Sequence, residues 1–167
     1  MRVITRAYFT SVFVQPIVFL LSLVINMIPG LVRGLTISVN DFYGLGFLFM
    51  SVLVVAAIYT LVIGVPIFFL LKYYDRLSWT SVTLAGIVAA AVPDALFSWP
   101  LWTDYSGYTS GGNWYGHYVE FIKDGVFTVY GWIRYVEEVF WFGIHGLVGA
   151  AVFYYVWLRH TPNKSFQ

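Results

Sequence analysis

The stretch VEEVFWFGIHGLVGAAVFYYVWL, residues 136–158, decides the fold class of this chain. It places two carboxylates at one end and a single histidine inside an otherwise apolar run. The run exceeds the roughly 20 residues that a helix needs to cross the hydrocarbon layer of a bilayer. This length and composition predict a membrane-spanning helix.

Three further apolar runs precede it, at about 8–28, 44–71 and 81–101. The whole chain is 60% hydrophobic and only 10% charged, whereas a soluble domain carries about 25% charged residues. We therefore predict an all-α integral membrane protein, a four-transmembrane-helix bundle that forms a single membrane domain over residues 1–167. The second run is so long that we expect it to tilt, to project beyond the membrane or to bend near Gly64-Val65-Pro66.

Basic residues predict the orientation, because lysine and arginine are enriched in cytoplasmic segments. Six of them fall on the side of the termini: Arg2, Arg6, Lys72, Arg76, Arg159 and Lys164. Three fall on the opposite side: Arg33, Lys123 and Arg134. We therefore expect a multi-pass protein of the bacterial inner (cytoplasmic) membrane with its N- and C-termini in the cytoplasm.

The segment 102–134 is the one substantial extramembrane segment, and we expect it to form a folded periplasmic cap. The composition of its first half predicts turns. Its second half contains two β-prone runs, 118–122 and 126–130, separated by the turn signal Lys123-Asp124-Gly125. A β-hairpin and an interfacial amphipathic helix both fit this half. Three tryptophans would lie at headgroup level as interface anchors: Trp102, Trp114 and Trp132.

Ionisable side chains are costly inside a span and are therefore the candidates for a proton or ligand site: Asp94, Glu138 and His145. Glu138, Phe142, His145 and Gly149 recur at helical spacing, so they share one face of the last helix. We expect a hydrogen bond or ion pair from His145 to Asp94. A proton relay or substrate site, and no contact at all, are the alternatives.

Proline at position 93 removes a backbone N–H and thereby frees the carbonyl near Ala89. Such a break is tolerated where neighbours or water satisfy the carbonyl, so a watery pocket near Asp94 is a hypothesis. In the first span, Gln15 and Asn26 are polar but uncharged, and interhelical hydrogen bonds would explain them.

Small residues recur along the last helix at intervals of three and four: Gly143, Gly146, Gly149 and Ala150. Such a face lets a second helix approach closely. It predicts a packing surface, either within the chain or between copies of it.

Several classes of function find no support. Cysteine is absent, net charge is +1 and no basic run occurs, so we expect no disulfide and no nucleic acid partner. His117 and Glu120 lack a further ligand at metal-like spacing. With no phosphate loop or nucleophile motif either, we expect no enzymatic activity, cofactor or metal.

Two functional classes remain. The first is an interaction protein, an accessory subunit or an immunity protein against a membrane-acting toxin. In size and predicted topology the chain is similar to the immunity proteins for pore-forming bacteriocins, a resemblance of architecture without a shared motif. The second is a small proton-coupled transporter or channel subunit that uses Asp94, Glu138 and His145. The expected partners are the lipid bilayer and a membrane protein or a second copy of the chain.

Overall fold

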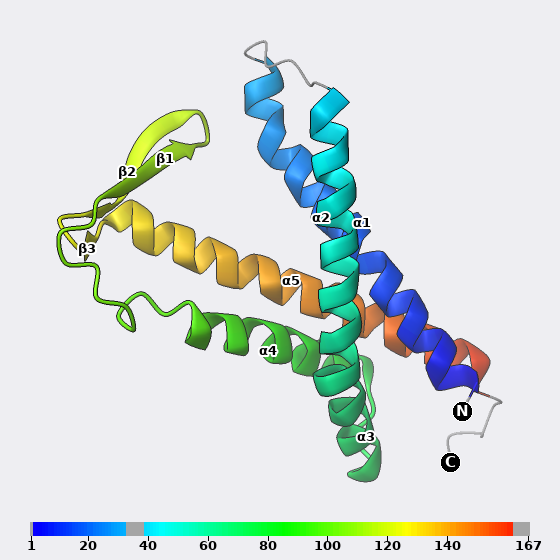
Figure 1. Ribbon diagram of the computed structural model, residues 1–167. Helices are drawn as coiled ribbons and strands as arrows, with labels where there is room; N and C mark the ends of the chain where they lie inside the picture. The colour runs from blue at the N-terminus through cyan, green and yellow to red at the C-terminus, as the bar shows by residue number, and fades with distance from the viewer. Residues whose placement is uncertain (1, 33–38, 162–167) are drawn as a thin grey trace.

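A computed structural model describes residues 2–32 and 39–161. It is mostly helical, and four of its helices are long and apolar enough to cross a membrane. Figure 1 shows two helical pairs, α1 with α2 and α4 with α5, which cross where α1 packs on α5. Arg33 and Lys164, used in the charge count, lie outside the described residues.

Each helix differs in length from its apolar run. The helices are α1 (Arg2–Val32), α2 (Val39–Tyr59), α3 (Val65–Tyr73), α4 (Trp79–Phe97) and α5 (Val129–His160). α1 and α5 extend well beyond 8–28 and 136–158, because hydropathy marks only the part of a helix matched to lipid. α4 stops short of the predicted residue 101, since Pro100 disfavours helix in the residue before it.

Of the three possibilities for the long second span, the structure shows an irregularity near Gly64-Val65-Pro66. A π-helical turn, η1 (Thr60–Gly64), joins α2 to α3, and the N–H of Val65 donates to the carbonyl of Thr60, five residues earlier. Pro66 follows directly and lacks an N–H. The wider turn is how this helix accommodates the proline.

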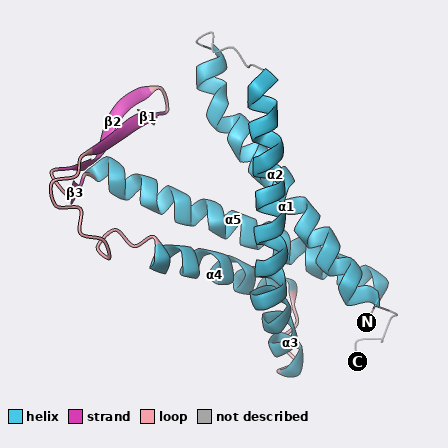
Figure 2. Ribbon diagram, in the orientation of Figure 1, coloured by secondary structure: helices cyan, strands magenta, loops and turns pink. Residues whose placement is uncertain are grey.

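The segment before α5 folds as a three-stranded antiparallel sheet, drawn in magenta in Figure 2. Its strands are β1 (Ser110–Trp114), β2 (His117–Lys123) and β3 (Val126–Phe127). The predicted hairpin at Asp124-Gly125 is present, and both turn residues have positive φ. Its second strand has only two residues because helix α5 begins at Val129.

The interpretation of 102–114 as turns was wrong in part, because β1 lies there and pairs with β2. The two strands meet in a two-residue turn at Tyr115-Gly116, both with positive φ, which is the geometry that suits a tight hairpin. We call residues 102–128, which comprise the sheet and its loops, the cap. It ends earlier than the predicted boundary at 134.

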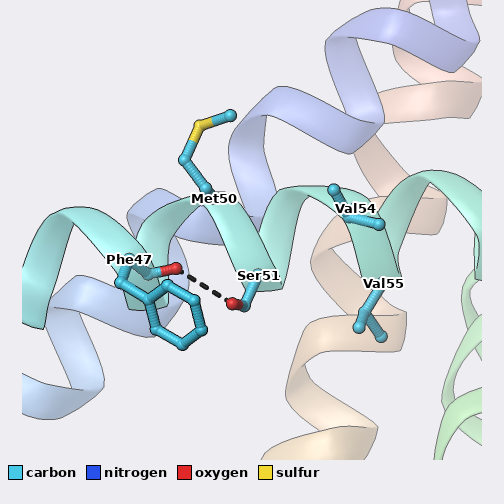
Figure 3. Close-up of a pocket in the computed structure, with 5 residues that line it drawn as sticks. All are labelled: Phe47, Met50, Ser51, Val54 and Val55. Atoms are coloured by element: carbon cyan, nitrogen blue, oxygen red, sulfur yellow. Dashed lines mark hydrogen bonds between the residues drawn. The ribbon is translucent and has the colours of Figure 1, made fainter.

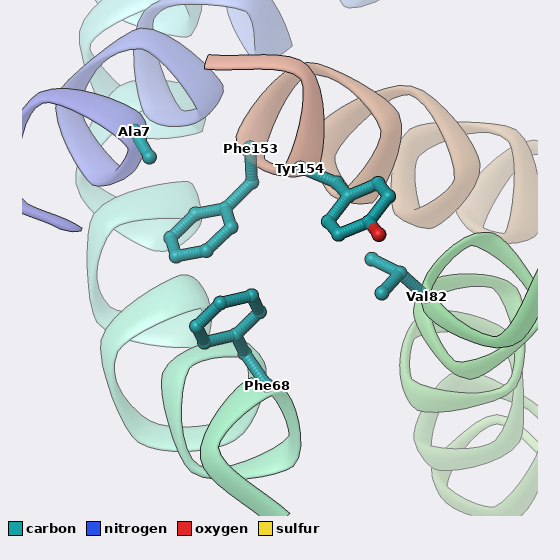
Figure 4. Packing of buried hydrophobic residues seen from close by; sticks show 5 residues of the cluster. All are labelled: Ala7, Phe68, Val82, Phe153 and Tyr154. Atoms are coloured by element: carbon teal, nitrogen blue, oxygen red, sulfur yellow. The ribbon is translucent and has the colours of Figure 1, made fainter. Parts of the chain in front are cut away.

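The apolar core lies near the end of the structure that is opposite the cap. Phe68 of α3 packs edge-on against Phe153 of α5, with ring centroids 4.9 Å apart. Ala7, Val82 and Tyr154 complete this cluster, so that it joins α1, α3, α4 and α5 (Figure 4). The start of α1 and the end of α5 therefore lie together at one end of the molecule (Figure 1).

Candidate functional site

A cavity of about 540 Å³ lies between α1, the α2–α3 helix, α4 and α5. Its wall is mostly apolar, and its polar members include Gln15, Tyr59, Glu138 and His145. We call it the interhelical cavity. A small number of polar groups on an apolar wall is the usual composition of a ligand site.

One face of α5 supplies much of this wall. Glu138, Phe142, His145 and Gly149 all line the interhelical cavity, which confirms that they share a face. Two turns of helix separate Glu138 from His145, so the polar groups are spread along the cavity.

His145 is held by Gln15, not by Asp94. The Gln15 side chain donates from Nε2 to the backbone carbonyl of His145 at 3.1 Å, and its Oε1 lies 2.7 Å from His145 Nδ1. Because Oε1 only accepts, the proton of the His145 ring must lie on Nδ1. The expected bond from His145 to Asp94 is therefore replaced by one to α1, as the polar character of Gln15 suggested.

Gly149 lies directly against this contact. A Cβ at Gly149 would lie 2.5 Å from Gln15 Nε2, so a side chain at this position would displace the end of the Gln15 side chain.

The remaining small residues pack α5 on α4. A Cβ at Gly146 would lie 2.7 Å from that of Ala90, and one at Gly86 would lie 2.6 Å from the Gly146 carbonyl oxygen. Gly143 faces Ile87 and Ala91, and Ala150 faces Gly86. These contacts lie within the chain and pack the small face of α5 on α4.

Asp94 lies in the last turns of α4. Its Oδ2 is buried and has no hydrogen-bond partner in the described part of the chain. Its charged neighbour is Glu138, and the Tyr59 hydroxyl is also within electrostatic range. A buried carboxyl oxygen without a partner is costly, which keeps Asp94 a candidate functional group.

The carbonyl that Pro93 frees does find a partner. The Tyr59 hydroxyl, from the α2 side of the interhelical cavity, donates to the carbonyl oxygen of Ala89. Neighbouring protein thus satisfies this group, and the hypothesis of a watery pocket is not needed to explain it.

Glu138 is paired within its own helix. It accepts from Arg134 Nε at 3.0 Å, and both side chains are about half exposed. The Arg134 guanidinium also lies over the Phe121 ring of β2, 4.6 Å from its centroid. Glu138 is therefore a neutralised carboxylate at the cap end of the interhelical cavity.

The cap is fastened to α5 by side chains from both partners. Glu137 accepts from Trp114 Nε1 at 3.1 Å and from the Tyr115 hydroxyl. This bond to a carboxylate raises the pKa of Tyr115. Buried Gly131 lets α5 approach the Phe121 carbonyl of β2 closely.

The three predicted anchor tryptophans have different surroundings. Trp102 is exposed in the loop after α4. Trp114 packs on Tyr130, and Trp132 packs on Trp99 and Tyr135. Trp114 and Trp132 thus join the cap, α4 and α5, a contribution to packing that the prediction of interface anchors did not include.

A second hollow lies on α2 alone (Figure 3). Phe47, Met50, Val54 and Val55 line it, and its one hydroxyl, that of Ser51, donates to the Phe47 carbonyl at 2.9 Å. With no charged group and no contribution from another helix, it is an apolar surface suited to lipid.

Two residues of the site were not predicted from the sequence. Tyr59 and Glu137 occupy positions that become informative only once their partners are known. Asn26 was expected to make an interhelical hydrogen bond, and its side chain lies outside the described residues. Within the described residues no three His, Asp or Glu side chains are grouped so as to hold a metal ion.

Comparison of the chain with protein-family models, curated proteins and solved structures finds no match.

Proposed function

We propose that this chain is a multi-pass protein of the bacterial inner membrane that acts by binding another protein. It would serve as an accessory subunit or as an immunity protein against a membrane-acting toxin. Four apolar helices support insertion, and the excess of basic residues on the side of the termini supports cytoplasmic ends.

The observation that carries the proposal is the construction of the cap. Hydrogen bonds to Glu137 and the contact at Gly131 hold its sheet on α5. The cap still exposes three tyrosines: Tyr108, Tyr115 and Tyr118. Tyrosine is enriched in protein interfaces, since it contributes a large contact area with few rotatable bonds.

Two exposed tyrosines at opposite ends of the molecule provide a matched test. Tyr118 in the cap is 76% exposed and Tyr73 at the end of α3 is 81% exposed. Tagged protein would be purified from its native membrane in mild detergent and its partners identified by mass spectrometry. We expect one stoichiometric partner, retained by Tyr73→Ala and reduced about tenfold by Tyr118→Ala, the effect of a hot-spot residue.

Other outcomes would count against the proposal. Recovery of the chain without any stoichiometric partner would remove the interaction class. Equal recovery of the partner with Tyr118→Ala and Tyr73→Ala would remove the cap as the recognition surface.

A second candidate, a proton-coupled transporter or channel subunit, is supported by Asp94. Its buried Oδ2 lacks a hydrogen-bond partner among the described residues and it has Glu138 as a charged neighbour. Proton flux into vesicles that contain the purified protein would test it. The flux should vanish in Asp94→Asn and persist in Asp75→Asn, a change at an exposed carboxyl between α3 and α4. Absence of flux at any pH would exclude it.

A further inference from the structure

We infer that the interhelical cavity binds one narrow apolar chain bearing a hydroxyl group, a long-chain membrane alcohol or phenol, whose O–H donates to His145 Nε2. This ligand site is separate from the cap, and it stands whether or not a protein partner binds there. Shape, hydrogen-bonding chemistry and charge each support it.

The shape of the cavity suits a chain. Its wall follows α5 from Glu138 to Phe153, a length of about 22 Å at 1.5 Å per residue. A volume of about 540 Å³ extends over that length.

The chemistry selects a hydrogen-bond donor. Gln15 occupies Nδ1 and places the proton there, so Nε2 of the neutral ring is an acceptor. No described residue donates to Nε2. Of the four hydroxyls of the wall, those of Ser22, Ser51 and Tyr59 donate to backbone carbonyls, and the fourth belongs to Thr60.

The charge of the wall favours a neutral ligand. Arg134 neutralises Glu138 at the cap end of the cavity. The opposite end, near Phe68 and Phe153, is apolar. A hydroxyl at His145 with its chain directed toward these phenylalanines matches both ends.

The test compares a long-chain ω-bromo alcohol with its methyl ether, which has the same chain but no donor. Bromine quenches tryptophan fluorescence on contact, and Trp141 lines the cavity. Both probes would be titrated into the full-length protein in lipid nanodiscs. We expect half-maximal quenching by the alcohol at about five- to tenfold lower concentration than by the ether, the equivalent of one hydrogen bond.

Variants identify the side chains responsible for the preference for the alcohol and for the quenching. In His145→Phe the advantage of the alcohol should disappear, and in Trp141→Phe the saturable quenching itself should disappear. Ala56→Leu narrows the cavity from the α2 side and leaves the residues Gln15 and His145 unsubstituted. It should weaken both probes equally, and it provides a test that does not depend on the folding of His145→Phe.

Three results would overturn the inference. The alcohol and ether could quench the wild-type protein equally. The saturable quenching could survive in Trp141→Phe, which would place the probe elsewhere. Ala56→Leu could leave both titrations unchanged, which would indicate general partition into lipid.

Discussion

The side-chain amide of Gln15 holds His145 at two points, the backbone carbonyl at 3.1 Å and the ring Nδ1 at 2.7 Å. The pair joins α1 to α5 across 130 residues of sequence. We expect Gln15→Leu to lower the free energy of unfolding by about 1–3 kcal/mol, because Nδ1–H is left buried without an acceptor.

Reversible unfolding in mixed micelles would measure this loss. Thr10→Val is the matched control, since the exposed Thr10 hydroxyl donates only to the Arg6 carbonyl of its own helix. Its effect should stay within about 0.5 kcal/mol. A Gln15→Leu effect no larger than this would show that the pair contributes little.

The Tyr59 hydroxyl compensates for the N–H that Pro93 lacks. Tyr59→Phe should cost about 0.6 kcal/mol and at most about 1.7 kcal/mol, the range of interhelical hydrogen bonds in membranes. Pro93→Ala restores an N–H that can donate to Ala89. In that background Tyr59→Phe should cost less, so a double-mutant cycle gives a coupling energy. Additive effects of the two substitutions would contradict this compensation.

Gly146 lies where α5 meets α4 at backbone distance. Gly146→Ala should destabilise the protein by about 1–3 kcal/mol, because the added methyl overlaps Ala90 and the Gly86 carbonyl. Gly46 in α2 has no atom near its missing Cβ. Gly46→Ala should therefore be neutral or stabilising by about 0.5–1 kcal/mol, owing to helix propensity. The same unfolding assay compares them, and equal effects would refute the close approach.

Tyr115 links the cap to Glu137 only while its hydroxyl is protonated. The bond raises the pKa of Tyr115 above its ordinary value of about 10. With the folded-state pKa above the unfolded one, the stabilisation is fully present below pH about 10 and is lost as the pH rises through the folded pKa. Titration of tyrosinate absorbance, wild type minus Tyr115→Phe, should show this late deprotonation.

Glu137→Gln removes the carboxylate and should return the pKa of Tyr115 toward about 10. The pKa of another cap residue, Asp104, is shifted in the opposite direction, because hydrogen bonds from the hydroxyl and N–H of Ser106 lower it. If the Tyr115 titration were unchanged in Glu137→Gln, the hydrogen bond would not be the cause.

Local sequence was sufficient for the number of apolar helices, the carbonyl freed by Pro93 and the small face of α5. Each depends on composition within one segment or on the missing N–H of a proline. The β2–β3 turn followed from Asp124-Gly125 for the same reason, since positive φ is a local requirement.

Tertiary structure alone decided which residues meet. His145 was placed on the correct face, but its partner depends on how α1 crosses α5, and that crossing brings Gln15 to His145. β1 contains two glycines and is ordered by pairing with β2, an interaction that no local propensity reveals. Hydropathy indicates whether a helix suits an apolar environment. Which helices it contacts is decided by the packing of side chains over its whole length.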